Sequence, residues 1–186
     1  MVSAFSLWLP ILLSAVIVFV ASSIIHMVLG YHASDVKAVP NEDQALASMR
    51  AMNLPPGDYC IPRPASMKDM GTPAFKEKMA KGPIVTFTTS AGVSGSMGGQ
   101  MTLWFLYSVV VSFVTAYITG IVYGPGATYP QIFRMAGTAG FACYAMALPQ
   151  FSIWYKRNWV TTLKGMFDGF VYGCLIGGTF GWLWPR

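Results

Sequence analysis

Glycine recurs at every fourth position in the stretch Trp159–Trp184, WVTTLKGMFDGFVYGCLIGGTFGWLW. The row consists of Gly165, Gly169, Gly173, Gly177 and Gly181. In water each glycine would cost a helix about 1 kcal/mol relative to alanine. In a bilayer the backbone must satisfy its own hydrogen bonds, so a spanning segment stays helical. Residues four apart share a face, so the row predicts a groove that another helix backbone enters closely.

The composition extends this interpretation to the rest of the chain. Only 10% of the 186 residues are charged, against about 25% in soluble domains. Four apolar stretches approach the roughly 20 residues that cross a bilayer core: Leu7–Leu29, Met101–Tyr123, Tyr129–Pro149 and Trp159–Trp184. They predict an all-α membrane protein with four transmembrane helices packed through small-residue (glycine-zipper) seams. Residues 1–30 form the first helix, 31–100 a long polar loop region with two short helices, and 101–186 the other three.

Small residues also recur at helical spacing in the second and third stretches. The second carries Ser112, Ala116 and Gly120, and the third carries Ala136 and Gly140. These seams predict close helix packing. Whether the glycine row packs within the chain or against another chain stays open at this level.

The polar region contains start and stop signals for two short helices. Asn41 precedes a capping-box pattern and a helix that runs to about Met52. Thr72 and the following proline read as the N-cap and first residue of a second helix, which ends at Gly82. Pro83–Thr89 has the composition of a strand, but a single short run cannot form a sheet.

Two further segments of this region read as irregular. The sequence PPGDYCIPRP, Pro55–Pro64, is too rich in proline for a helix or a central strand. Its Asp58, Tyr59 and Arg63 are candidate contacts for a partner, unless the segment merely links two helices. Ser90–Gly99 is small and glycine-rich, which predicts a loop without a phosphate-binding motif.

Asp168 is the one acidic residue within a predicted span, and intramembrane carboxylates are candidates for function. The plainer interpretation is a position near the headgroups, paired with Lys164 one turn earlier or with Arg157. His26 lies toward the same predicted membrane face, and His32 and Asp35 follow it. Two histidines and two carboxylates are able to bind a divalent metal or relay a proton, although their spacing matches no metal signature. A histidine hydrogen-bonded inside a tight bundle is the alternative.

Other features limit the function classes. Arg134 predicts either snorkelling to the interface or contact with a lipid phosphate or a partner carboxylate. The three cysteines form no CxxC pair and no disulfide scaffold. No nucleic-acid-binding motif or basic stripe accompanies the net charge of +5. The sequence contains no GxSxG or HExxH motif, so it predicts no enzyme and names no cofactor.

Several motifs together resemble a bacterial family of small integral membrane proteins to which no activity is assigned. They are GYHASD, VPNEDQAL, PPGDY, the SMKDM–KGP stretch, SIWYKRNW and FDGFVYGCLIGGTFGWLWP. The resemblance covers most of the chain. It implies four spans and a bacterial origin, and it assigns a role to no residue.

Basic residues predict the orientation, because they favour the cytoplasmic side. Lys37, Lys81, Lys156, Arg157 and Lys164 lie near the side of the long loop. We therefore expect a multi-pass protein of the bacterial inner membrane, with the loop in the cytoplasm and both termini outside. The predicted function is that of a non-enzymatic accessory or assembly subunit of a larger membrane complex, or a self-associating protein. The alternatives are a small transporter or channel with a His26/Asp168 polar path, and a membrane enzyme acting on lipid or quinone.

Overall fold

The structure is a computed structural model that describes residues 1–92 and 96–186. The chain divides into two compact units. The helical unit comprises Met1–Val36 and Ser96–Arg186, and the small unit comprises Lys37–Gly95. Most described residues are helical, as the sequence predicts.

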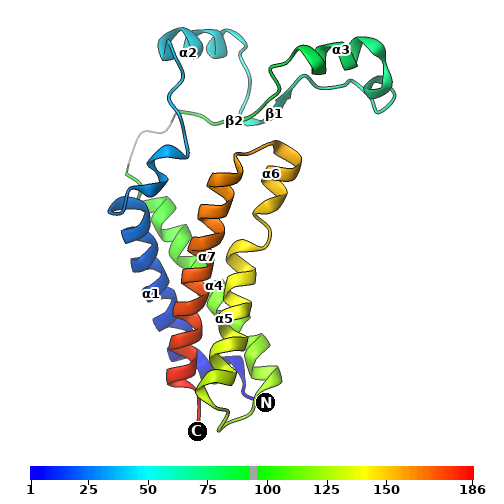
Figure 1. The fold of residues 1–186 in the computed structure, drawn as a ribbon. Helices are drawn as coiled ribbons and strands as arrows, with labels where there is room; N and C mark the ends of the chain where they lie inside the picture. Colours follow the sequence, from blue (N-terminus) through cyan, green and yellow to red (C-terminus); the bar gives the residue numbers. More distant parts are fainter. Residues whose placement is uncertain (93–95) are drawn as a thin grey trace. The chain divides into compact units, whose positions relative to one another are not determined.

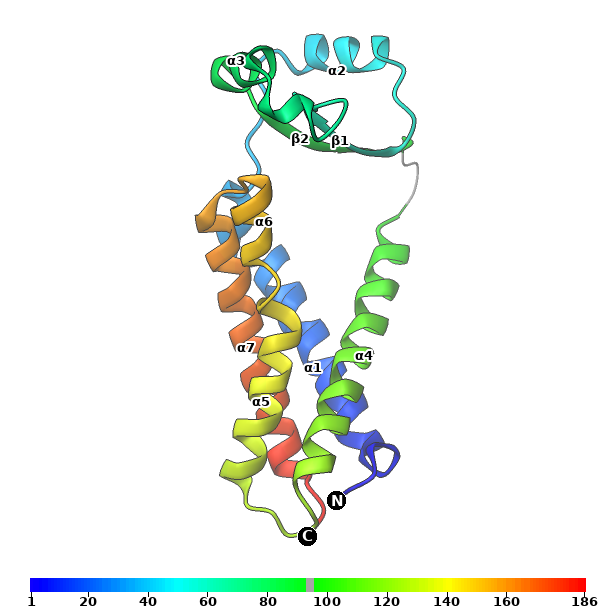
Figure 2. The same ribbon diagram turned by 90° about the vertical axis from the view of Figure 1, so that its right-hand side faces the viewer.

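Five α-helices and two single 3-10 turns form the described part of the helical unit. They are η1 (Ala4–Leu7), α1 (Trp8–Met27), η2 (Tyr31–Ser34), α4 (Gly98–Val122), α5 (Tyr129–Ala145), α6 (Pro149–Tyr155) and α7 (Trp159–Leu183). Helices α5 and α7 lie side by side (Figures 1 and 2), and theirs is the most extensive helix contact in the unit. Helix α1 contacts both α4 and α7.

The glycine row of α7 packs against α5 of the same chain. A Cβ added at Gly173 would lie 2.7 Å from the carbonyl oxygen of Gly137, and one at Gly177 would lie 2.7 Å from that of Phe133. A Cβ at Gly181 would lie 2.7 Å from the ring of Tyr129. The two backbones are therefore in direct contact, and the glycine row packs within the chain.

The seams of the second and third predicted helices are also buried. Ala116 and Ala136 are fully buried, and the Ser112 hydroxyl lies 3.3 Å from that of Ser14. Gly120 accepts a hydrogen bond of 2.8 Å from the Val2 amide through its carbonyl oxygen. A Cβ at Gly140 would meet Ile176 of α7 at 3.0 Å.

Two of the described helices are long and apolar enough to cross a membrane, Ala4–Met27 and Gly98–Val122. Of the four predicted membrane spans, only these two have the length and hydropathy that crossing a membrane requires. Helix α5 has 17 residues, which gives about 26 Å against a hydrocarbon core of about 30 Å. Helix α7 is long enough, but its glycines, Lys164 and Asp168 lower its hydropathy.

The third predicted stretch, Tyr129–Pro149, is not one helix. Helix α5 ends at Ala145 and the short α6 starts at Pro149. Proline lacks an amide hydrogen and restricts the residue before it, so the helix breaks ahead of Pro149.

The chain is mostly helical, as predicted, but the small unit also contains a two-stranded sheet that the sequence did not predict. The elements of this unit are α2 (Glu42–Ala51), β1 (Gly57–Ile61), η3 (Asp69–Gly71), α3 (Pro73–Lys81) and β2 (Val85–Thr89). The strands pair antiparallel, from Gly57 opposite Thr89 to Ile61 opposite Val85. The prolines argued only against a central strand; they flank β1 and leave its five residues free to pair in a sheet of two strands.

The helix caps of the chain follow the sequence in part. Thr72 caps α3 by accepting from the Phe75 amide at 3.3 Å, as predicted. Asn41 precedes α2 with φ 55° and makes no side-chain cap, so its predicted capping box does not form. The capping box that does form uses Thr128 and Gln131 at the start of α5. The predicted loop Ser90–Gly99 lies partly outside the described residues, since 93–95 are not described, and Gly98 already belongs to α4.

Candidate functional site

A polar cluster forms where the segment after α1 meets α7. Helix α1 ends at Met27, and Gly30 then adopts φ 64°. This left-handed conformation costs glycine little and lets the chain turn sharply into η2. The turn brings His32 of η2 against Asp168, almost ten residues into α7.

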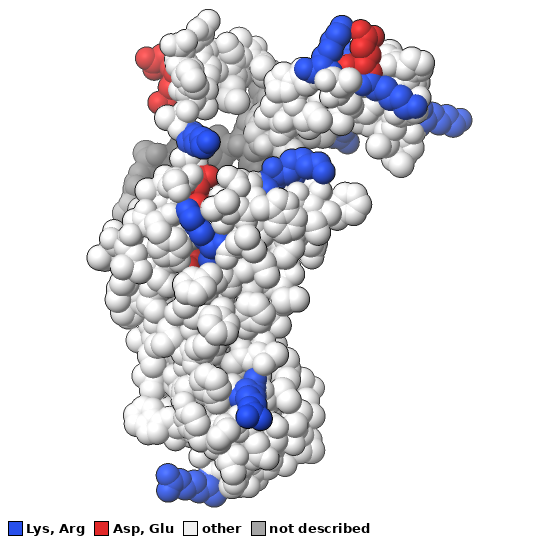
Figure 3. Space-filling view, viewed as in Figure 1, with Lys and Arg blue, Asp and Glu red and all other residues white. Residues whose placement is uncertain are grey.

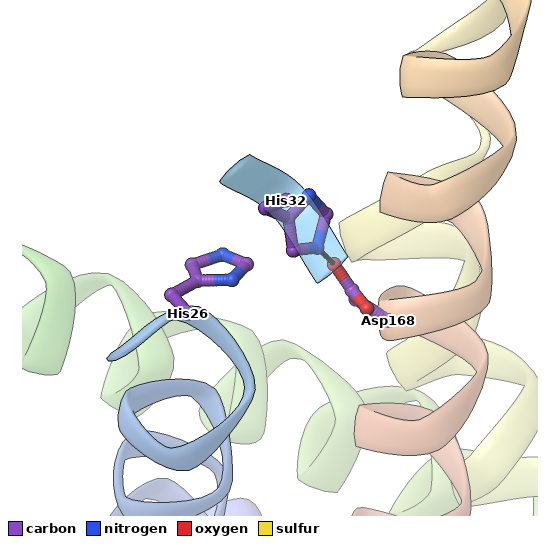
Figure 4. A group of neighbouring side chains, drawn as sticks. All are labelled: His26, His32 and Asp168. Carbon is purple, nitrogen blue, oxygen red and sulfur yellow. Dashed lines mark hydrogen bonds and ion pairs between the residues drawn. The ribbon is translucent and has the colours of Figure 1, made fainter. Parts of the chain in front are cut away.

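His32 lies between two carboxylates. Its Nε2 is 2.8 Å from Oδ2 of Asp168, and its Nδ1 is 2.6 Å from Oδ2 of Asp35. Asp168 is only 4% exposed and also accepts a hydrogen bond from the Tyr31 hydroxyl. In Figure 4 His32 and Asp168 point toward one another, and His26 approaches from α1.

Lys164 fixes the second carboxylate of the cluster. Its Nζ lies 2.8 Å from Oδ1 of Asp35, 2.6 Å from the Tyr31 carbonyl oxygen and 3.0 Å from the Ser34 hydroxyl. Burial raises the pKa of Asp35, but the hydrogen bonds from Lys164 and His32 outweigh it, so the net pKa is lowered. Asp35 therefore stays ionised at neutral pH and can only accept from His32. The expected partner of Lys164 was Asp168, whereas the structure pairs it with Asp35.

His26 completes a group of three potential metal ligands. Its ring centroid is 4.5 Å from that of His32. One donor atom from each of His26, His32 and Asp168 falls within 4.8 Å of the other two. Two imidazoles and a carboxylate suit zinc and other divalent transition metals. The spacing of the two histidines in the sequence did not predict this group, because the turn at Gly30, and not one continuous helix, brings them together.

The cluster borders a cavity of about 360 Å³. Its lining includes His26, His32 and Asp168 together with Arg157 and the hydroxyl side chains of Thr161 and Thr162. A ligand held by the three donors would thus border a cavity that Arg157 also lines. Arg157 was predicted here only as a possible ion-pair partner of Asp168, a pair that does not form among the described residues. Tyr31 was not predicted at the site, and only its position directly after Gly30 indicates its role.

The other predicted contact residues are not members of this cluster. In the small unit, Asp58 accepts from the Thr88 hydroxyl at 2.6 Å, Tyr59 donates to the Pro55 carbonyl oxygen at 2.8 Å, and Arg63 is exposed. The bond between Asp58 and Thr88 joins β1 to β2, and the bond between Tyr59 and Pro55 is local. The predicted partner contacts of the three residues stay a prediction. Arg134 is exposed on α5, beside a groove of about 210 Å³ that Phe133 and Phe141 also line.

Comparison of the chain with models of protein families, with curated proteins and with solved structures gives no match. The assignment of the cluster as a functional site therefore depends on its geometry alone.

Proposed function

We propose that the protein is an integral membrane protein that binds a divalent transition-metal ion through His26, His32 and Asp168. The observation that carries the proposal is the pair of facing atoms His32 Nε2 and Asp168 Oδ2, 2.8 Å apart. Because the ionised Asp35 takes the Nδ1 hydrogen, neutral His32 presents a lone pair to a carboxylate oxygen. A cation must then lie between them, either a second proton or a metal.

Three features favour the metal. His32 Nε2 and Asp168 Oδ2 lie 2.8 Å apart, which is close enough for both atoms to bind one divalent ion at ordinary bond lengths of about 2.0–2.2 Å. His26 lies within reach as a third ligand. Asp35 accepts from the non-ligating nitrogen of His32, which is the usual arrangement around a metal-bound histidine. Lys164 and Tyr31 hold the two carboxylates in position.

The membrane part of the proposal extends the two apolar helices to all four long ones. Helices α1 and α4 satisfy length and hydropathy, and α7 offers α5 a glycine groove that backbone contact fills. The face of the helical unit visible in Figure 3 carries few charged side chains along most of its length. We place the protein in the bacterial inner membrane, with the small unit in the cytoplasm and both termini outside.

The proposed role as an accessory subunit gains no support from the glycine row, because that row already packs against α5 of the same chain. Association with other membrane proteins would use the exposed apolar residues of α1 and α4 instead. Action on a lipid or quinone would use the open side of the metal.

The metal proposal predicts one high-affinity ion per chain. Purified protein is stripped with a chelator in mild detergent and titrated calorimetrically with Zn²⁺ and Mn²⁺. We expect stoichiometric binding of at least one of these ions, loss of that binding in His32→Ala, and an affinity about 10–100-fold weaker in Asp35→Asn, whose carboxylate only orients His32. Glu77→Gln, in an exposed ion pair of α3, is the control and should bind like the wild type.

A wild-type protein that binds neither ion more tightly than folded His32→Ala would show that a proton, and not a metal, lies between His32 and Asp168. Circular dichroism of both proteins establishes that they are folded.

The orientation predicts how the exposed Cys60 reacts with a membrane-impermeant maleimide. In intact spheroplasts Cys60 should stay unlabelled, and it should react fully after permeabilisation. The Cys60→Ser variant measures the background labelling that comes from Cys143 and Cys174. Labelling of Cys60 before permeabilisation would place the small unit outside the cell.

A further inference from the structure

A row of hydroxyl side chains runs along the buried face of α4. It consists of Ser108, Ser112, Thr115 and Thr119, and all four are fully buried. Their spacing of four, three and four residues keeps them on one helix face. On α1, Ser14 and Ser22 are buried as well. We call these six residues the hydroxyl column.

Two hydrogen-bond contacts cross between the helices in one half of the column, and a third lies within α4. The Trp104 indole donates to the Ser22 hydroxyl at 2.8 Å, and the Ser108 hydroxyl donates to the Trp104 carbonyl oxygen at 3.0 Å. The Ser14 hydroxyl lies 3.3 Å from that of Ser112. Helices α1 and α4 are antiparallel here, so successive pairs follow one another along the helix axes.

The other half of the column has buried hydroxyls without a partner. Among the described residues, Thr115 Oγ1 and Thr119 Oγ1 accept and donate no hydrogen bond, and the same is true of the Tyr144 and Tyr172 hydroxyls. A helical threonine ordinarily satisfies its hydroxyl at the carbonyl four residues earlier. Buried polar groups that remain unpaired call for an explanation, such as bound water or a functional role.

A pocket of about 260 Å³ opens beside the connected half. Ser22, Gln100 and Trp104 contribute to its lining, so one side chain of the column is reached directly from this pocket. From Trp104 to Thr119 the helix rises about 22 Å at 1.5 Å per residue. That length is most of a hydrocarbon core of about 30 Å.

We infer that the hydroxyl column, linked by water, is a proton path through the helical unit. A hydroxyl can accept a proton on a lone pair and release its own proton to the next oxygen, so charge moves without a net change in the chain. Hydroxyls one helical turn apart are separated by about 5–6 Å, a gap that one bridging water closes. The six residues of the column include no carboxylate or imidazole, so the column offers no site for a divalent transition metal.

The inference rests on the proposed membrane crossing of α1 and α4, and it is independent of the metal. It is tested in proteoliposomes with a trapped pH-sensitive dye, with valinomycin and a potassium gradient to drive proton entry. Wild-type protein should acidify the vesicles faster than protein-free liposomes do. Thr115→Val, which removes one hydroxyl at nearly constant shape, should slow this flux at least tenfold.

Thr102→Val is the matched control because Thr102 lies on the same helix but is exposed, and it should conduct like the wild type. Wild-type flux equal to that of empty liposomes would overturn the inference. So would a Thr115→Val protein that melts at a higher temperature and conducts unchanged, because its hydroxyl would then be only a buried unpaired group. Metal titration of Thr115→Val should give wild-type affinity, so the two proposals are decided by separate readouts.

Discussion

Replacing Gly173 by leucine should prevent the helical unit from reaching its native packing. A Cβ at this position would lie 2.7 Å from the Gly137 carbonyl oxygen and 3.0 Å from both the Cβ and the amide nitrogen of Phe141. Two of these three atoms are backbone, so no side-chain rotation relieves the clash. Overpacking by even a methyl group costs about 1–3 kcal/mol, and leucine adds three further carbons. We expect little monodisperse protein by size-exclusion chromatography in detergent.

A pair of alanine substitutions controls for helix propensity. Gly173→Ala and Gly178→Ala gain the same roughly 1 kcal/mol of propensity. Only the first brings a clash, because a Cβ at Gly178 meets nothing closer than the Tyr129 hydroxyl at 3.7 Å. Gly173→Ala should therefore melt below the wild type and Gly178→Ala at or above it. Equal melting temperatures for the two variants would contradict the backbone contact between α5 and α7.

Replacing Asp168 by leucine should give the second large loss of stability. The carboxylate is 4% exposed and satisfies both the Tyr31 hydroxyl and His32 Nε2. Removing one member of a buried ionic pair typically costs about 3–5 kcal/mol. We expect a loss of this size in detergent unfolding measured with excess chelator, so that the ion cluster alone is probed.

Two further variants separate charge from shape at this position. Asp168→Asn keeps the shape and one acceptor oxygen, so a smaller loss of about 1–3 kcal/mol is expected. Phe167→Leu changes the exposed neighbouring residue and should stay within about 0.5 kcal/mol of the wild type. A wild-type unfolding curve for Asp168→Leu would mean that η2 is not anchored to α7 by this carboxylate.

The long helices were predictable because their signals are periodic and local. Small residues four apart identify the packing faces of α4, α5 and α7, and the structure buries those faces. The partner of the glycine row was not predictable, since spacing defines a groove without naming what fills it. The same limit applies to β1 and β2, which are separated by 23 residues and become strands only by pairing with each other.

The residues of the cluster were predictable in type but not in arrangement. Asp168 stood out as a carboxylate in an apolar stretch, and both histidines lay near the same predicted membrane face. Their geometry depends on the turn at Gly30, which periodicity does not describe. That turn directs Lys164 to Asp35 and leaves Asp168 to His32.

The order of the helices along the chain determines when each contact between helices can form during synthesis. Helices α5 and α7 are near neighbours in sequence and can meet soon after both emerge. Helix α1 ends at Met27, whereas its partner α7 begins at Trp159. At about 5–20 residues per second, α1 waits roughly 7–26 s for that partner. During this interval α1 can contact α4 but not α7, so the face of α1 that packs against α7 stays uncovered and the young chain is most vulnerable to degradation before its last helix is made.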